Sequence, residues 1–210
     1  MRFRILNKDY FFDYREACKI TQGTDLWVHN DGWKPRDARA YWIKQIVANH
    51  SCIRSIHFRL VDTRPKTVIN QIIRATKGHP QPEVESSRPD WTGKERSFDP
   101  YEDKLFMQDH TAESFIAMAR QRLCMKTEER TRDFMAEMVK TLRQCDEPFL
   151  QAVGYCCAPA CSWYGKRCPE PLGCGKCPSL AAEIIGLYKR CSGIALYDKK
   201  EEAEIAMERR

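Results

Sequence analysis

The spacing of apolar residues predicts a helix, a strand and a second helix in succession between residues 36 and 75. Residues 36–49 place their apolar side chains near one helical face, whereas residues 55–61 alternate apolar and polar positions as a strand does. Pro65 stands where the second helix would begin, because its fixed φ suits a first helical turn. The apolar face of that helix consists of Val68, Ile69, Ile72 and Ile73.

The flanking regions divide into less regular and more helical parts. Residues 1–35 indicate two short strands, one near Phe3 and one over 25–29, with a turn at Gly32-Trp33. Residues 92–110 look polar and linker-like. Residues 111–151 carry a helical stripe of Phe and Met residues, which is typical of core packing. Residues 199–210 indicate a frayed helix or a disordered end.

The segment that follows the second helix is rich in polar chemistry. Pro80, Pro82 and Pro89 exclude a helix, and Gly78 loosens the chain. A helix that delivers polar residues to such a loop is one way to build an anion pocket. An ordinary solvated loop is the alternative interpretation. The polar residues in question are Lys77, His79, Glu83, Glu85, Ser86, Ser87, Arg88 and Trp91.

Composition narrows the class of protein. The chain has 210 residues, 42% of them hydrophobic, which favours one folded domain with a small appendage. No apolar run approaches the roughly 20 residues that span a bilayer, and the first residues resemble no secretory signal. We therefore expect a cytoplasmic protein without a membrane segment. The net charge of +6 favours anionic ligands such as nucleotides, and more weakly nucleic acid.

The chain contains 11 cysteines, six of them between residues 156 and 177. Cys174 and Cys177 have the spacing of a zinc-knuckle ligand pair, and thiolates from the rest of the group would complete a tetrahedral site. The sequence thus predicts a metal module, with zinc favoured. An iron–sulfur cluster and a set of buried reduced thiols are the alternatives. The candidate ligands are Cys156, Cys157, Cys161, Cys168, Cys174 and Cys177.

Short motifs in residues 36–153 resemble, in order and surroundings, those of the flavin-dependent thymidylate synthase (ThyX) family. Gln71-Ile-Ile-Arg74 resembles the family's Gln-x-x-Arg, and Ser86-Ser-Arg88 resembles Ser-x-Arg. Ala119-Arg120-Gln-Arg-Leu123 and Leu142-Arg143 resemble two later motifs. The Arg-His-Arg signature of the family reads Arg74-Ala75-Thr76 here, so mainly the nucleotide side of the family pattern is retained.

The resemblance implies an α/β (α+β) fold, with a mixed sheet flanked by long helices. It also implies a homotetramer, a pyrimidine deoxynucleotide such as dUMP as substrate, FAD as cofactor and a folate one-carbon donor. With the cysteine-rich stretch added, we expect three parts: a ThyX-like nucleotide-binding domain over 1–153, the cysteine-rich module over 154–193 and a tail over 194–210. The residues implied in nucleotide binding are Gln71, Arg74, Ser86, Arg88, Arg120 and Arg143. Arg143 and Ser86 would also act in catalysis, and His50 and Arg74 would contact the flavin.

Two hypotheses of different class remain at this point. The first is an enzyme that transfers a one-carbon unit to the C5 atom of a pyrimidine deoxynucleotide, using guanidinium groups to hold the phosphate. The second is a non-enzymatic, zinc-bearing protein that binds nucleic acid or another partner on the same scaffold. In that case basic residues with Trp91, Trp163 and Tyr164 would form a stacking surface.

Overall fold

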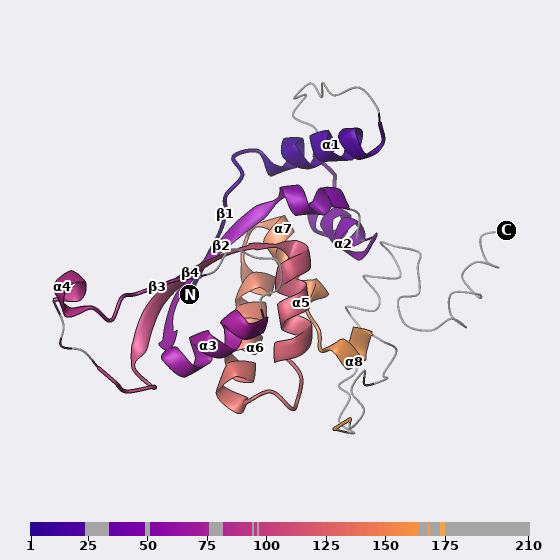
Figure 1. The fold of residues 1–210 in the computed structure, drawn as a ribbon. Helices are drawn as coiled ribbons and strands as arrows, with labels where there is room; N and C mark the ends of the chain where they lie inside the picture. The colour runs from indigo at the N-terminus through magenta and orange to yellow at the C-terminus, as the bar shows by residue number, and fades with distance from the viewer. Residues whose placement is uncertain are drawn as a thin grey trace.

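The computed structural model confirms the α/β class, with helices packed against a four-stranded sheet (Figure 1). It describes residues 1–23, 34–48, 51–75, 82–93, 95, 97–163, 168 and 173–174. The elements in these residues are β1 (Arg2–Ile5), α1 (Tyr10–Thr21), α2 (Ala38–Ala48), the 3-10 helix η1 (Ser51–Ser55), β2 (His57–Pro65), α3 (Lys66–Ala75), β3 (Glu83–Val84), α4 (Pro89–Thr92), β4 (Asp103–Thr111), α5 (Ala112–Arg122), α6 (Glu129–Gln144), α7 (Pro148–Cys156) and α8 (Ala160–Trp163).

The sheet has the strand order β1-β2-β4-β3, and each neighbouring pair is antiparallel. We expected a mixed sheet, so the described strands differ from that expectation. The long central pair sets the register, with Phe58 opposite His110 and Leu60 opposite Gln108. Antiparallel pairing of this kind allows one face to be buried while the other remains polar.

The expectation of a linker over residues 92–110 was wrong, because β4 is a central strand within it. The strand was hidden by its inward positions, of which Lys104, Gln108 and His110 are polar and only Phe106 is apolar. Lys104 tolerates burial because its ammonium group lies 2.8 Å from a carboxylate oxygen of Glu102. The apolar alternation that predicts strands is therefore absent here.

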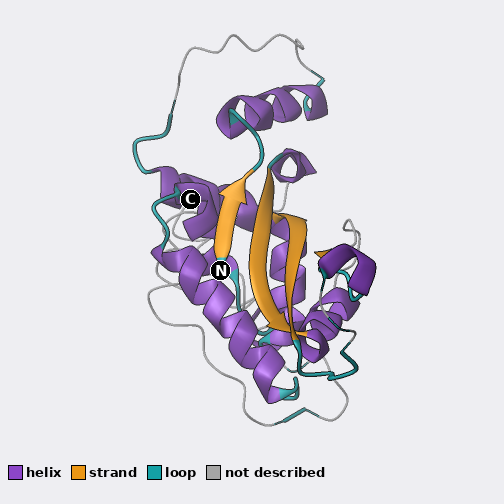
Figure 2. Ribbon diagram, turned by 90° about the vertical axis from the view of Figure 1, so that its left-hand side faces the viewer, coloured by secondary structure: helices purple, strands orange, loops and turns teal. Residues whose placement is uncertain are grey.

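Helices cover one face of the sheet. Figure 2 looks toward the strands and shows the helices behind them. Phe58 and Phe115 pack with ring centroids 5.6 Å apart, and Phe106 meets Phe134 edge-on at 6.1 Å. These contacts join the two central strands to α5 and α6, so the core lies between the sheet and these helices.

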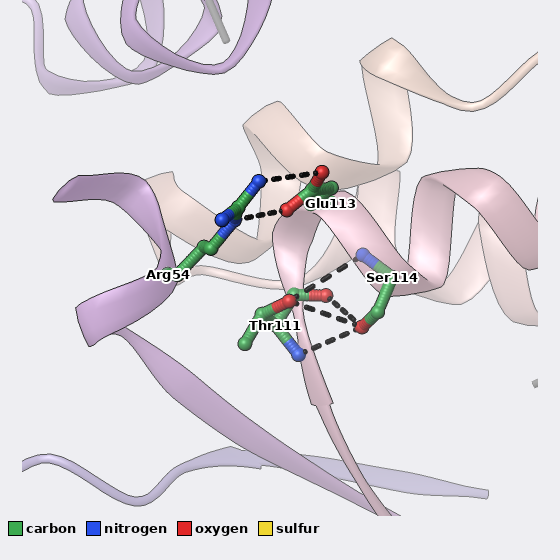
Figure 3. A network of polar contacts seen from close by, with 4 residues as sticks. All are labelled: Arg54, Thr111, Glu113 and Ser114. Atoms are coloured by element: carbon green, nitrogen blue, oxygen red, sulfur yellow. Dashed lines mark hydrogen bonds and ion pairs between the residues drawn. The ribbon is translucent and has the colours of Figure 1, made fainter. Parts of the chain in front are cut away.

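Two helices follow their strands without a connecting loop. Lys66 and Thr67, at the start of α3, donate backbone hydrogen bonds to the carbonyl oxygens of Glu102 and Pro100. At the start of α5, Thr111 and Ser114 form a reciprocal capping box (Figure 3). Direct strand-to-helix passage fixes where each helix starts relative to the sheet.

Helix α1 was not anticipated by the sequence pattern, which we interpreted as a mixed segment. Asp9 caps it by accepting a hydrogen bond from the amide of Phe12. Phe11 packs against Trp42 of α2 at a centroid distance of 4.9 Å, and Trp42 packs against Phe149 of α7 at 5.3 Å. This aromatic layer joins the N-terminal helix to the core.

The short helix α4 contradicts the expectation that Pro89 excludes a helix, because proline is tolerated in a first helical turn. The longer helices agree with the periodicity. Those expected over 36–49, after Pro65, and within 111–151 correspond to α2, α3, α5, α6 and α7. The strand expected over 25–29, the turn expected at 32–33 and the tail over 199–210 lie outside the described residues. The boundary expected at 153–154 falls within α7. Within the described part of the chain, no helix has the length and hydropathy that crossing a bilayer requires.

Candidate functional site: an arginine cluster

The C-terminal ends of α3 and α5 carry a group of arginines. The two helices start from opposite ends of the antiparallel β2–β4 pair and pack against each other. Each is about 15 Å long, roughly half the length of these nine-residue strands, so they end near the middle of the sheet. Arg74 occupies the last turn of α3, and Arg120 and Arg122 occupy that of α5. Cations at these positions also complement the helix dipoles.

Arg122 is held in an unfavourable electrostatic environment. Burial lowers the pKa of its guanidinium, and the positive charge of Arg74 lowers it further. Its Nε atom is buried and has no hydrogen-bond partner among the described residues. No carboxylate in the described part of the chain pairs with either arginine. Two neighbouring guanidinium groups of this kind can bind an anion such as a phosphate.

Arg143, at the end of α6, is bound to the backbone of α7. Its Nε donates to the carbonyl oxygen of Gly154 at 2.9 Å, and its Nη2 donates to that of Cys157 at 3.3 Å. Its guanidinium also lies over the ring of Tyr155, 5.6 Å from the centroid. Such contacts satisfy carbonyl groups at a helix C-terminus. Arg143 therefore has a structural role that does not depend on a ligand.

Cys157 links Arg143 to Arg120. Burial raises the pKa of its thiol, and the charges of Arg143 and Arg120 oppose that rise. The two arginines are therefore near one buried group. Three of the predicted nucleotide residues thus lie in two arginine pairs: Arg120 lies near Arg143, and Arg74 lies near Arg122, which was not predicted. Arg122 was missed by the sequence analysis, although its position two residues after Arg120 in a last helical turn was visible.

Ser86 and Arg88 lie in a different part of the molecule. Arg88 is the N-cap residue of α4, a helix that stands apart from α5 and α6 (Figure 1). The Ser86 hydroxyl accepts a hydrogen bond from the Arg88 amide at 3.1 Å. The Arg88 guanidinium pairs with Asp90 at 2.6 Å and lies 4.7 Å from the ring centroid of Trp91. Within one subunit, these two residues form a local network separate from the arginine cluster.

The residues that the resemblance assigns to the flavin do not form a fitting site in the described structure. Ala75 stands where the family has the histidine of Arg-His-Arg, and its side chain is buried in the core. Arg74 is exposed, Gln71 is half-buried on α3, and His50 lies outside the described residues. We therefore derive no reaction step through a flavin.

The cysteine group is only partly described. Cys156 and Cys157 belong to the core, and the thiol of Cys157 donates to the carbonyl oxygen of Val153 at 3.2 Å. Cys161 is also buried, Cys168 is exposed and Cys174 is half-buried. Cys177 lies outside the described residues. Among the residues that the structure does describe, no group of three or more potential ligands is arranged to hold a metal ion.

A second cationic site was also missed by the sequence analysis. An open pocket of about 500 Å³ lies between the first residues of α2 and those of α7. Arg39 at its edge extends over the ring of Tyr155, with 5.4 Å between guanidinium carbon and centroid. The lining consists of Arg36, Asp37, Ala38, Arg39, Pro148 and Gln151.

Comparison with known proteins adds no relative, since no family model and no curated protein matches the chain. The resemblance to flavin-dependent thymidylate synthases therefore rests on the short motifs alone.

Proposed function

We propose that this chain binds a pyrimidine deoxynucleoside monophosphate, with Arg74 and Arg122 holding the phosphate. The supporting observation is the charge arrangement at the ends of α3 and α5. Arg122 is desolvated and repelled by Arg74, and the described residues supply no carboxylate to either. A phosphate carrying up to two negative charges would relieve the repulsion and accept hydrogen bonds from both guanidinium groups.

The chemistry of the neighbouring residues is compatible with a nucleotide. Gln71 lies one helical turn before Arg74 on α3, so its amide is close enough along the helix to meet a base or sugar edge. Arg120 and Arg143 form the second cationic pair, near Cys157. The position of Gln71 beside Arg74 favours a ligand with a strongly anionic end joined to a polar, uncharged part.

The activity that goes with this ligand is a further part of the proposal. By its resemblance to the ThyX family, the protein would transfer a one-carbon unit to C5 of the pyrimidine, with a folate as donor and within a homo-oligomer. Metal binding by the cysteine group and a cytoplasmic location also belong to the proposal. Mass spectrometry of the nucleotide after incubation with candidate donors would reveal C5 alkylation.

The binding proposal is tested by titrating the full-length protein with dUMP in a calorimeter at low salt. We expect Arg122→Gln and Arg74→Gln each to weaken binding roughly 10- to 100-fold, because each removes a charge-assisted contact. Arg54→Gln is the matched control. Arg54 pairs with Glu113 in the first turn of α5 (Figure 3). Arg122 occupies the last turn of that helix, so Arg54→Gln should leave the affinity for dUMP unchanged.

The nucleoside 2′-deoxyuridine, which lacks only the phosphate of dUMP, separates the contribution of the phosphate from that of the base and sugar. If the nucleoside binds as tightly as dUMP, the arginines do not hold the phosphate. If dUMP does not bind at all to well-folded protein, the nucleotide proposal is wrong.

The second candidate function, nucleic-acid binding, is supported by an exposed aromatic residue beside an arginine. Trp91 is 71% exposed and is stacked by Arg88, which resembles the aromatic and cationic pairs that bind single-stranded nucleic acid. The basic residues expected to join it, Lys77, His79, Lys166, Arg167 and Lys176, lie outside the described residues. This alternative predicts salt-sensitive binding of an oligonucleotide that Trp91→Ala abolishes.

A further inference from the structure

The pocket between the first residues of α2 and those of α7 has no part in the proposed nucleotide site. Its volume of about 500 Å³ lies in the range of small-molecule sites, and it is open to solvent. Helix α7 contributes Pro148 and Gln151 to the lining, and the chain that enters α2 contributes the two arginines, Arg36 and Arg39. The lining shares no residue with the arginine cluster at the ends of α3 and α5.

Arg39 is a half-buried cation with an incomplete set of hydrogen bonds. Its guanidinium carbon lies 5.4 Å from the ring centroid of Tyr155, which follows Gln151 by about one turn of α7. Its Nε atom is buried and has no hydrogen-bond partner among the described residues. Neither Arg39 nor Arg36 belongs to an ion pair in the part of the chain that the structure describes. A buried donor without a partner costs free energy, which an anionic acceptor would recover.

Arg143 provides a comparison within the molecule. Its guanidinium also lies over the ring of Tyr155, 5.6 Å from the centroid, but its Nε donates to the carbonyl oxygen of Gly154 at 2.9 Å. The aromatic contact is common to Arg39 and Arg143, so the two differ in their hydrogen bonds. Arg39 is the one that retains donor capacity for a ligand.

The two carboxylates at the starts of these helices are engaged by backbone and side-chain donors. Asp37 accepts a hydrogen bond from the amide of Ala40 at 2.9 Å, as an N-cap residue does. Glu147 accepts from the Tyr10 hydroxyl and from the amide of Phe149 at 3.3 Å. The lining itself contains two guanidinium groups and one carboxylate, so its net charge is positive.

We propose that this pocket binds the carboxylate or phosphate group of a small organic ligand, with Arg36 and Arg39 holding the oxyanion. Guanidinium groups present paired N–H donors that match two oxygens of such a group. Arg36 is exposed and meets an entering anion, whereas Arg39 is half-buried. The Gln151 amide nitrogen donates to the carbonyl oxygen of Cys145 at 2.5 Å, so its own carbonyl oxygen remains to accept from an N–H or O–H group of the ligand.

NMR of the arginine Nε–H groups in the full-length, ¹⁵N-labelled protein tests the proposal. The protein is titrated at pH 7 with inorganic phosphate and, separately, with acetate, while sodium chloride keeps the ionic strength constant. We expect saturable shifts of the Arg36 and Arg39 signals, which are assigned by their loss in Arg36→Lys and Arg39→Lys. A response to phosphate alone identifies the ligand as a phosphate ester, and a response to acetate identifies it as a carboxylic acid.

The affinity of the anion that binds should depend on both arginines. Arg39→Gln should raise the dissociation constant read from the Arg36 signal roughly tenfold, because a charge-assisted contact is lost. Arg130→Gln is the matched control. Arg130 also lies over a tyrosine ring, 4.8 Å from the centroid of Tyr101, but it is no part of the pocket lining and should leave the dissociation constant unchanged.

Shifts that fail to saturate, or that sodium chloride alone reproduces, would overturn the proposal. Equal weakening by Arg39→Gln and Arg130→Gln would do the same. If Arg39→Gln does not fold, the Arg39 signal of the unsubstituted protein still decides the question. The result is independent of the nucleotide proposal, because that proposal is read from dUMP affinity in Arg74 and Arg122 variants.

Discussion

The arginines of the sheet surface have different charged neighbours from those at the ends of α3 and α5. Arg59 on β2 holds Asp109 on β4 through two hydrogen bonds of 2.6 and 2.8 Å. Arg64 contacts both Asp62 and Glu137. Arg122 has a second arginine as its charged neighbour instead. An arginine side chain thus stabilises the folded state on the sheet surface and destabilises it at the end of α5. The difference indicates which guanidinium groups are available to an external anion.

The largest expected effect on stability comes from disturbing the packing of α6 on α7, where the backbone of α7 occupies the Arg143 side chain. A Cβ atom at Gly154 would lie 2.9 Å from both the Arg143 backbone nitrogen and the Leu142 Cβ. Gly154→Ala should therefore separate α6 from α7 and lower the free energy of unfolding by about 3 kcal/mol, measured by urea denaturation. An unchanged midpoint would mean that the helices are not packed this closely.

Removing the Arg143 side chain should have a somewhat smaller effect. Arg143→Leu takes the guanidinium donors away from the carbonyls of Gly154 and Cys157, and we expect a loss of about 2 kcal/mol in the free energy of unfolding. Arg130→Leu is the matched control, because Arg130 is exposed and lies over the ring of Tyr101. If Arg143→Leu is as stable as the control, Arg143 is not a structural residue and returns to the set of ligand candidates.

The sequence predicted the helices better than the strands, for a physical reason. The α3 stripe of Val68, Ile69 and Ile72 is buried as its periodicity required. In β4, by contrast, an ion pair and tertiary packing bury polar side chains, and no local pattern reports such long-range compensation. A strand of this type is visible only once its partner strand and covering helices are known.

The candidate site was predictable only in part. The motifs directed attention to the ends of α3, α5 and α6, where Arg74, Arg120 and Arg143 lie. They did not include Arg122, and they grouped Arg88 with residues that lie elsewhere in the subunit. Whether two arginines attract a common anion depends on their other partners. Asp90 for Arg88 and a backbone carbonyl for Arg143 are partners that sequence spacing does not reveal.

The same substitution, Arg to Leu, should change the free energy of unfolding in opposite directions in the two regions. Without ligand, Arg122→Leu should raise the free energy of unfolding by about 0.5 kcal/mol, because it removes a repelled charge whose partial exposure to solvent screens the repulsion. Arg59→Leu should lower it, since Asp109 loses its partner. Thermal unfolding in buffer without phosphate measures both. Equal destabilisation by the two variants would show that Arg122 has an intramolecular role like that of Arg59.

The smallest effect on stability near neutral pH concerns Glu102. Its carboxylate lies between Lys66 and Lys104, so here an anion is surrounded by cations, whereas in the arginine cluster cations lie beside each other. Hydrogen bonds from Lys104 and Lys66 lower the pKa of Glu102 from 4.5 to about 2. A lowered pKa in the folded state gives a stabilising contribution that is complete above the unfolded value of 4.5. That contribution is lost as the pH falls toward 2, so stability should be unaffected between pH 6 and 8 and decline in acid. Carboxyl NMR of the folded protein should show Glu102 titrating far below pH 4. A midpoint near 4.5 would mean that the lysines do not hold this carboxylate, and the burial of Lys104 would then need another explanation.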